Sequence, residues 1–269
     1  MVDRIGLKTV RDFGEQFSHY PDTTGFFGSA DLFADIIRPL LEPEELSGKT
    51  VADIGSGPGR IVNMLLTAGA RHVWAVEPSA EGFAALKRNT AHHQGRIEYL
   101  NAHGEELPSG LGLDFVLSIG VIHHIPDPHG TMRACLAALR PGGRCLVWLY
   151  GREGNGAYLG LVLPLRKLTT ALPHRLLAGL CQALNVMLDA YLLLCRRLPL
   201  PLKGYALNVL GRMSRDKRYL VIYDQLKPAY AKYYTKAEAR DLLSRAGFSD
   251  IRLHHRHGYS WTVIGTRPA

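Results

Sequence analysis

A glycine-rich segment after a short apolar run is the clearest place for chemistry in this chain. It reads VADIGSGPGR (residues 51–60), with Gly55 and Gly57 two positions apart and Asp53 before them. Glycines in such a turn adopt positive φ and let a ligand lie against the backbone, while the next helix offers free N–H groups. Glu77 comes twenty residues after Gly57, where a carboxylate can accept hydrogen bonds from both hydroxyls of a ribose. We therefore expect a nucleoside-type cofactor here.

The third glycine of the common dinucleotide-binding pattern is missing from this segment. Arg60 lies where GxGxxG has its last glycine, so the spacing is GxGxG with an acid two positions before it. Together with two β-like runs that close the chain, this departure disfavours a nicotinamide-dependent dehydrogenase.

Four polar side chains follow later apolar runs. His123 and His124 come after LDFVLSIGVI, whereas Tyr150 and Asn155 come after RCLVWL. Ligands of open α/β sheets bind outside the carboxyl ends of the strands. We therefore expect these side chains at one cleft, where a histidine or tyrosine could act as a general base.

Residues 48–150 alternate between strand-like and helix-like patterns. Continuous apolar runs suit strands that are buried on both faces, and the alternation is typical of a parallel sheet. The predicted strands are 50–54, 72–76, 96–100, 113–119 and 144–149, and the predicted helices are 60–69, 79–92 and 129–140.

The two ends of the chain add further predicted elements. The first forty-five residues contain two helices, the second over 31–41 with Ser29 as its N-cap. Near the other end, Thr235 caps a helix, and the β-like runs 251–255 and 260–266 meet at Gly258.

Residues 157–218 differ from the rest in composition and charge. They are rich in leucine and hold ten Lys and Arg against two acids, so this segment accounts for the whole net charge of +8. Three polar residues interrupt its longest apolar stretch, 176–195, which favours an amphipathic helix over a transmembrane one.

The overall composition, with 46% hydrophobic and 21% charged residues, excludes disordered, collagen-like and disulfide-scaffold proteins. Four cysteines without a CxxC pair indicate free thiols in a reducing compartment. The first residues carry frequent charges and lack the apolar core of a signal peptide. We therefore expect a cytoplasmic protein.

Four sequence blocks resemble the class I S-adenosylmethionine-dependent methyltransferases of the small-molecule branch. They are VADIGSGPG, WAVEPS, LDFVLSIGVIHHIPDP and LRPGGRCLVW, and the resemblance covers about residues 48–150 and 233–266. It implies a Rossmann-like α/β fold, with a seven-stranded, mostly parallel sheet that ends in an antiparallel hairpin. The implied parts are an N-terminal helical lid (1–47), a cofactor-binding core (48–150), a helical cap or insert (151–232) and a segment that completes the core sheet (233–269).

The resemblance also implies S-adenosylmethionine as cofactor and assigns its contacts. Glu77 would hold the ribose, and Asp53 would reach the amino group of the methionine part. His103 stands where the family usually has an aspartate that contacts the adenine amino group, and a neutral histidine can accept through one nitrogen. The full set of implied cofactor contacts is Tyr20, Asp53, Gly55, Ser56, Gly57, Glu77, Pro78, His103, Ser118, Ile119 and Gly120.

The implied activity is methyl transfer to a small molecule with an apolar or anionic portion, as in small-molecule biosynthesis. The step is an in-line displacement that needs alignment and sometimes a base but no metal. The candidate catalytic residues are His123, His124, Tyr150 and Asn155. In the family the second histidine is often structural.

Other activities of the same fold remain open from the sequence. Attack on another carbon of the sulfonium, including attack by the cofactor's own amino group, would release methylthioadenosine and make S-adenosylmethionine itself the substrate. A cofactor-binding protein without catalysis is a further alternative, because the motifs specify how the cofactor is held and not which carbon reacts.

Three roles remain open for the basic insert: a cap over a hydrophobic substrate, peripheral contact with anionic lipid, and a homodimer interface. Nucleic acid is not expected, since the bases are not interleaved with exposed aromatic residues. A metal is not expected at His254, His255 and His257 either, because neighbours in a strand point to opposite faces.

Overall fold

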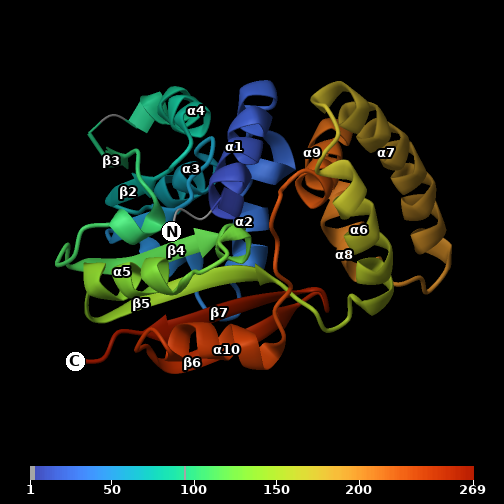
Figure 1. Ribbon diagram of the computed structural model, residues 1–269. Coiled ribbons are helices and arrows are strands. Elements are labelled where there is room, and N and C mark those ends of the chain that lie inside the picture. Colours follow the sequence, from blue (N-terminus) through green and yellow to red (C-terminus); the bar gives the residue numbers. More distant parts are fainter. Residues whose placement is uncertain (1–3, 94) are drawn as a thin grey trace.

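A seven-stranded sheet runs through the centre of the computed structural model, which describes residues 4–93 and 95–269 (Figure 1). The strand order is β3-β2-β1-β4-β5-β7-β6. The first five strands are parallel, whereas β7 pairs antiparallel with both β5 and β6. The expected fold class is confirmed. The strands are β1 (Thr50–Ile54), β2 (His72–Val76), β3 (Ile97–Leu100), β4 (Leu113–Ile119), β5 (Leu139–Tyr150), β6 (Ser249–Arg256) and β7 (Ser260–Thr266).

Ten α-helices accompany the sheet in the described ranges. Alternate residues of the strands belong to two apolar clusters, because successive side chains point to opposite faces. One cluster includes residues of α2 and α3, and the other includes residues of α5 and α10. Helices therefore cover both faces. They are α1 (Arg4–His19), α2 (Ala30–Ile37), α3 (Arg60–Thr67), α4 (Ala80–Thr90), α5 (His129–Ala138), α6 (Gly156–Thr169), α7 (His174–Arg197), α8 (Lys203–Asn208), α9 (Arg215–Leu226) and α10 (Lys236–Ser244).

Local signals placed most boundaries correctly. The predicted bounds of β1, β2 and β4 match, and Ser29 and Thr235 cap their helices by accepting from Leu32 N and Glu238 N. The helix predicted over 31–41 ends at Ile37 because Pro39 lacks an N–H and forces the residue before it out of helical geometry.

The start of β5 was predicted five residues too late. The strand already pairs at Leu139, opposite Leu113, and the register shifts before the regular pairing begins. Gly143 makes this possible, since a Cβ there would lie 2.9 Å from the carbonyl oxygens of Arg140 and Leu113. The Pro-Gly-Gly sequence reads as a turn, although the chain remains in the sheet.

The insert forms a separate layer of helices at one side of the sheet, and α1 lies between the two (Figure 1). Helices α7 and α9 enclose a small apolar core of their own, which contains Leu177, Cys181 and Tyr223. Ion pairs Lys217–Asp22 and Lys227–Glu15 tie this layer to the N-terminal segment. The predicted lid, of which residues 1–3 lie outside the described ranges, therefore contacts the predicted cap directly.

Helix α7 is, within the described ranges, the one helix long and apolar enough to cross a membrane when only its length and composition are considered. In its most apolar window 22% of the residues are buried in the protein. One face of α7 packs against the protein and the rest of the helix surface is uncovered, as expected for an amphipathic helix.

Candidate active site

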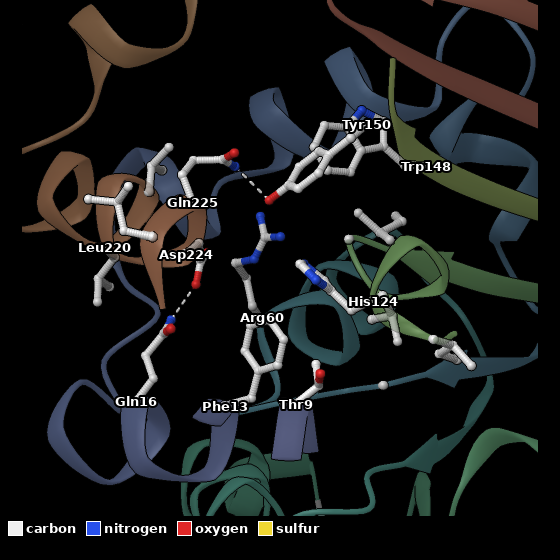
Figure 2. Close-up of a pocket in the computed structure, with 18 of the residues that line it drawn as sticks. Thr9, Phe13, Gln16, Arg60, His124, Trp148, Tyr150, Leu220, Asp224 and Gln225 are labelled. Carbon is white, nitrogen blue, oxygen red and sulfur yellow. Dashed lines mark hydrogen bonds between the residues drawn. The ribbon is translucent and has the colours of Figure 1, made fainter. Parts of the chain in front are cut away.

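A cavity of about 1180 Å³ lies at the carboxyl edge of the sheet, enclosed by α1 and the insert. The loops after β1, β2, β4 and β5 line one half of it, and residues of α1, α6, α7 and α9 line the other. Figure 2 shows side chains from both halves pointing toward one space. A ligand held at the strand ends would therefore face the insert.

The glycine turn after β1 has the conformation that its sequence requires. Gly55 and Gly57 have φ of 74° and 49°, and Gly55 N and Ser56 N donate to the carbonyl of Val76. A Cβ on Gly55 would lie 2.5 Å from both methyl groups of Val121. Both the backbone angle and the close approach therefore demand glycine at position 55.

Asp53 lies beneath this turn, and one of its two carboxylate oxygens is unsatisfied within the described ranges. It is 1% exposed, and its Oδ2 has no hydrogen-bond partner among the described residues. Burial raises the pKa of this carboxyl to about 7. A buried acceptor without a partner fits a cationic group such as the amino group of the expected cofactor.

Glu77 lines the cavity at the end of β2 and has a fixed orientation. Its Oε2 accepts from Gly57 N at 2.8 Å, and its Oε1 accepts from Ser79 N at 2.9 Å and Ser79 Oγ at 2.5 Å. Burial raises its pKa. Because a carboxylate has about four acceptor sites, room remains for a ribose hydroxyl.

The structure brings most of the sequence-predicted cofactor residues to this cavity. Asp53 and Ser118 do not line it; Ser118 is buried, and its hydroxyl donates to Ile54 O at 3.2 Å. Their proposed contacts with the cofactor remain predictions, as do those of the lining residues. The predicted residues that line the cavity are Tyr20, Gly55, Ser56, Gly57, Glu77, Pro78, His103, Ile119 and Gly120.

The two histidines after β4 occupy different places. His123 is fully buried, does not line the cavity and stacks on Tyr150 with ring centroids 3.8 Å apart. His124 lines the cavity, and its Nδ1 donates to the carbonyl of Tyr230 at 2.7 Å. Burial holds the pKa of His123 well below its usual range and lowers that of His124 to about 4. A neutral His124 thus keeps the lone pair of Nε2 as an acceptor.

Tyr150 and Asn155 both line the cavity, but their side chains make different hydrogen bonds. The Tyr150 hydroxyl accepts from Gln225 Nε2 at 2.7 Å, and burial raises its pKa well above the usual value, so it remains a phenol. Asn155 Nδ2 donates to Gly151 O and Tyr259 O, both at 2.7 Å. Both donor hydrogens of the Asn155 amide are therefore used to hold the loop after β5 in place.

The sequence analysis did not predict that Gln16, Arg60 and Asp224 line the cavity. Arg60 is partly buried, its guanidinium carbon lies 4.3 Å from the centroid of the Phe27 ring, and it makes no ion pair within the described ranges. Burial lowers its pKa to about 10. Asp224 accepts from Gln16 Nε2 at 2.5 Å, and burial raises its pKa to about 6 (Figure 2). In the sequence, Arg60 was noted only because it occupies the position of a missing glycine. Gln16 and Asp224 are 208 positions apart, so no local pattern could predict their contact.

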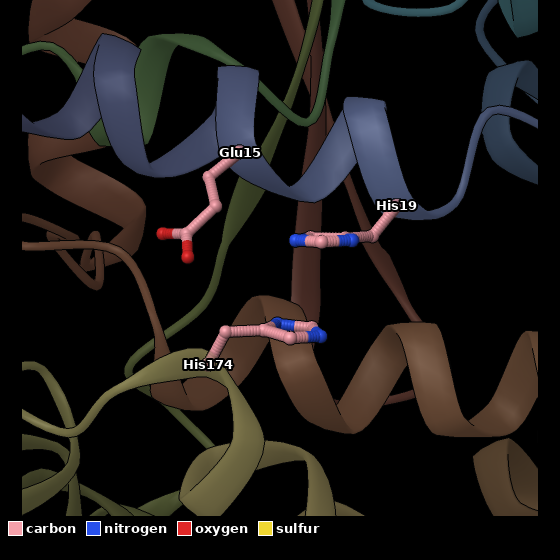
Figure 3. A group of neighbouring side chains, drawn as sticks. All are labelled: Glu15, His19 and His174. Carbon is pink, nitrogen blue, oxygen red and sulfur yellow. The ribbon is translucent and has the colours of Figure 1, made fainter.

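A cluster of Glu15, His19 and His174 lies where α1 meets α7, and one ligand-type atom from each falls within 4.8 Å of the others (Figure 3). The imidazoles stack face to face at 3.9 Å, and Glu15 pairs with Lys227 at 2.8 Å. Stacked rings turn their faces and not their nitrogens toward each other. The cluster thus joins α1 to the insert through ring stacking and an ion pair.

Comparisons with known proteins agree with this geometry. A family described as "Methyltransferase domain" matches residues 52–147. A ubiquinone biosynthesis O-methyltransferase of Aromatoleum aromaticum is 31% identical over 131 residues, 48% of this chain and 55% of the relative. An uncharacterized methyltransferase of Mycobacterium ulcerans is 30% identical over 167 residues, 57% of this chain and 64% of the relative. The chain thus spans about half to two thirds of the length of these curated relatives.

The solved structures show the same fold. An S-adenosylmethionine-dependent methyltransferase from Mesorhizobium loti aligns with a TM-score of 0.53 and 20% identity, over 89% of this chain and 99% of the other. S-adenosylmethionine is the cofactor of this family, and the partnerless Asp53 and the oriented Glu77 fit it. The strand order, the glycine turn and these matches together show a Rossmann-like methyltransferase fold, in which residues 52–147 match the methyltransferase-domain family.

Proposed function

We propose that this protein transfers the methyl group of S-adenosylmethionine to a small molecule that has an apolar body and a polar or anionic end. The observation that carries this proposal is the continuity of the cavity from the glycine turn to the insert. Leucines of α6, α7 and α9 line its far half, and Arg60, Asp224 and Gln225 supply polar groups near its centre.

The cofactor supplies an activated methyl group, and the chain supplies alignment and an acceptor for the proton. His124 and Asp224 are the candidate proton acceptors. His124 is neutral at pH 7, whereas Asp224, with a pKa of about 6, is mostly ionised there. Asp224 is the better base for a hydroxyl acceptor, because a pKa near the working pH suits general base catalysis.

Two features support a hydroxyl on an aromatic or apolar framework as the acceptor. Relatives named as ubiquinone biosynthesis O-methyltransferases match the core. The aromatic rings of Trp148, Tyr150 and Tyr233 lie around the inner cavity, where they can stack on a planar acceptor and attract a sulfonium.

Mass spectrometry of the products tests this function. The chain is incubated with S-adenosylmethionine alone and then with a small-molecule extract. We expect S-adenosylhomocysteine and a product heavier by one methylene only when extract is present. Methylthioadenosine from the cofactor alone would contradict the proposal. An Asp224→Asn variant should retain cofactor binding and lose most turnover, whereas Asp241→Asn on the exposed face of α10 serves as the control.

We further propose that the protein is cytoplasmic and that its basic insert contacts an anionic surface. The location is supported by four buried free cysteines, and the contact by the surplus of bases in residues 157–218. Cell fractionation tests both: we expect the protein in the cytosol together with a salt-releasable membrane fraction. Recovery only outside the cytoplasm would refute the location.

A further inference from the structure

The outer face of α6 and α7 is an apolar surface that no described part of the chain covers. Apart from Ile5 and Leu7, the exposed large apolar side chains of the described residues all fall between residues 161 and 198. On α7 they include Leu176, Met187 and Leu194, which recur at helical spacing and are 50–67% exposed, and Leu193, next to Leu194, is 57% exposed. Contiguous exposed apolar patches of this kind mark interaction sites.

Exposed bases flank this apolar face. Arg175 lies at the beginning of α7, and Arg196 and Arg197 lie in its last turn. The acid on this helix, Asp189, is already paired with Arg215 and with Arg218. The surface thus combines apolar side chains with uncompensated positive charge, the combination that binds anionic bilayers.

The same face continues into the cavity. Leu161 of α6 and Met187 of α7 are 71% and 67% exposed, and both also line the cavity. Behind them Leu165, Leu184 and Leu188 form its inner wall. An apolar chain that enters between these helices would thus remain in contact with apolar side chains along its path toward the polar centre.

We propose that the α6–α7 face docks on an anionic lipid bilayer and that an acceptor dissolved in the bilayer enters the cavity past Leu161 and Met187. The substrate part of this inference rests on the proposed methyl transfer, whereas the docking part does not. The proposal concerns binding along the surface, because the opposite side of α7 is committed to the protein. There Leu177 and Cys181 are buried against α9, and Asn185 Nδ2 donates to Arg215 O at 2.8 Å.

The charge pattern favours a bilayer over a second copy of the chain. A two-fold interface brings the same patch of both copies together, so each set of flanking arginines would face another. Anionic headgroups instead neutralise those bases while the leucines enter the boundary of the acyl chains.

Vesicle co-sedimentation without added cofactor tests the docking part. The probes are vesicles of phosphatidylcholine alone and vesicles with about one third phosphatidylglycerol. We expect at least tenfold tighter binding to the anionic vesicles, and a loss of at least tenfold in the variants Leu193→Gln/Leu194→Gln and Arg196→Glu/Arg197→Glu. Lys87→Glu/Arg88→Glu, an exposed double change of the same total charge on α4, is the matched control and should bind like wild type.

Two results would overturn docking. One is equal recovery of wild type with neutral and anionic vesicles. The other is a concentration-dependent dimer, seen by sedimentation velocity, that the Leu193→Gln/Leu194→Gln variant abolishes, since a second copy would then cover the face. Circular dichroism and S-adenosylhomocysteine binding, which should remain unchanged, show that the variants are folded.

The delivery part is tested with radiolabelled S-adenosylmethionine and cell lipid extract reconstituted in anionic vesicles. We expect label in the lipid phase, reduced at least fivefold by Leu193→Gln/Leu194→Gln. Label only in the aqueous phase, with docking intact, would overturn delivery and leave methyl transfer standing. A third outcome is that no label enters either phase of the vesicle assay and none is transferred when an aqueous small-molecule extract is supplied instead. With docking intact, this outcome would overturn delivery and the proposed function together.

Discussion

At the scale of single residues, Arg60 places a partly buried guanidinium on the wall of the cavity. It hydrogen-bonds Phe27 O at 3.3 Å and has no carboxylate within ion-pair distance in the described ranges. A partly buried positive charge that lacks a close ion-pair partner favours an anionic ligand group, so we expect one in this cavity. Arg60, Tyr150 and Gln225 line the same cavity (Figure 2), so we expect that anionic group on the acceptor.

Replacing Arg60 by Met should lower kcat/KM for the acceptor by about 10–100-fold, the usual loss for a charged hydrogen bond. Arg60→Lys, which retains the charge, should lose less. Affinity for S-adenosylhomocysteine, measured calorimetrically, should change by no more than about threefold. Selective loss of S-adenosylhomocysteine binding, with methylthioadenosine unaffected, would instead assign Arg60 to the carboxylate of the cofactor.

Asp53 and Glu77 are both buried carboxylates, yet they predict opposite effects on stability. Asp53 Oδ2 is partnerless, so Asp53→Asn should leave the free enzyme equally or more stable while weakening S-adenosylmethionine about tenfold. Glu77 accepts three hydrogen bonds, so Glu77→Gln should weaken both the cofactor complex and the free fold. Thermal melts with and without cofactor measure both effects. A destabilised free Asp53→Asn would refute the assignment.

At the scale of elements, the sequence predicted best where each strand carries its own signal. The apolar runs of β1, β2 and β4 located those strands to the residue. The start of β5 was missed because the pairing of Leu139 with Leu113 depends on a neighbouring strand and not on the Pro-Gly-Gly sequence. Periodicity alone also gave no information on which face of α7 would remain uncovered.

The site divides in the same way. The half that we assign to the cofactor lies on loops that directly follow strands, so spacing alone placed Gly55 and Glu77 at the cavity. Its acceptor half forms where α1, α3 and α9 meet, and the Gln16–Asp224 hydrogen bond joins distant parts of the chain. Contacts of this kind depend on tertiary packing, which no local pattern encodes.

The turn between β1 and α3 gives a prediction at this scale. Gly55→Ala would put a Cβ at positive φ and 2.5 Å from the Val121 methyl groups, so we expect a loss of about 2 kcal/mol in unfolding free energy. Adding Val121→Ala should recover part of that loss. Gly179→Ala, which has open space in the second turn of α7, should instead stabilise the fold by up to about 1 kcal/mol. Urea denaturation measures all three; equal effects of the first and last changes would contradict this account.

At the scale of the whole molecule, three sequence-distant parts meet around one cavity. Loops at the sheet edge line the half where we expect the cofactor, and α1 and the insert line the half where we propose that the acceptor binds. The stacked pair His19 and His174 and the Lys227–Glu15 ion pair hold lid to insert at the outside. Binding in the cavity therefore stabilises all three parts together, and ligands should raise the melting temperature of one transition rather than split it.

The buried histidines make the stability of this assembly depend on pH. His123 is neutral in the folded protein because burial, and then the charges of His124 and Arg166, hold its pKa well below the usual range. The unfolded chain binds a proton near pH 6.5, so the folded state loses stability as the pH falls through that value. Asp53 and Asp224 act in the opposite sense, because their folded pKa values of about 7 and 6 are raised. His124, whose folded pKa is lowered to about 4, acts like His123, whereas burial also raises the pKa of Glu77. The wild-type profile between pH 7 and 5 is therefore the sum of these opposed contributions.

A variant separates the two contributions. His123→Phe retains a ring that can stack on Tyr150 and removes the titrating group. Between pH 6 and 5, wild type should lose stability relative to this variant by about 1 kcal/mol per pH unit, the slope for nearly one proton. Above pH 7.5 the two profiles should run parallel, since His123 is then neutral in both states. Urea unfolding across this range measures the difference. Parallel profiles below pH 6 would mean that His123 is protonated in the folded protein, which would leave a buried charge beside His124.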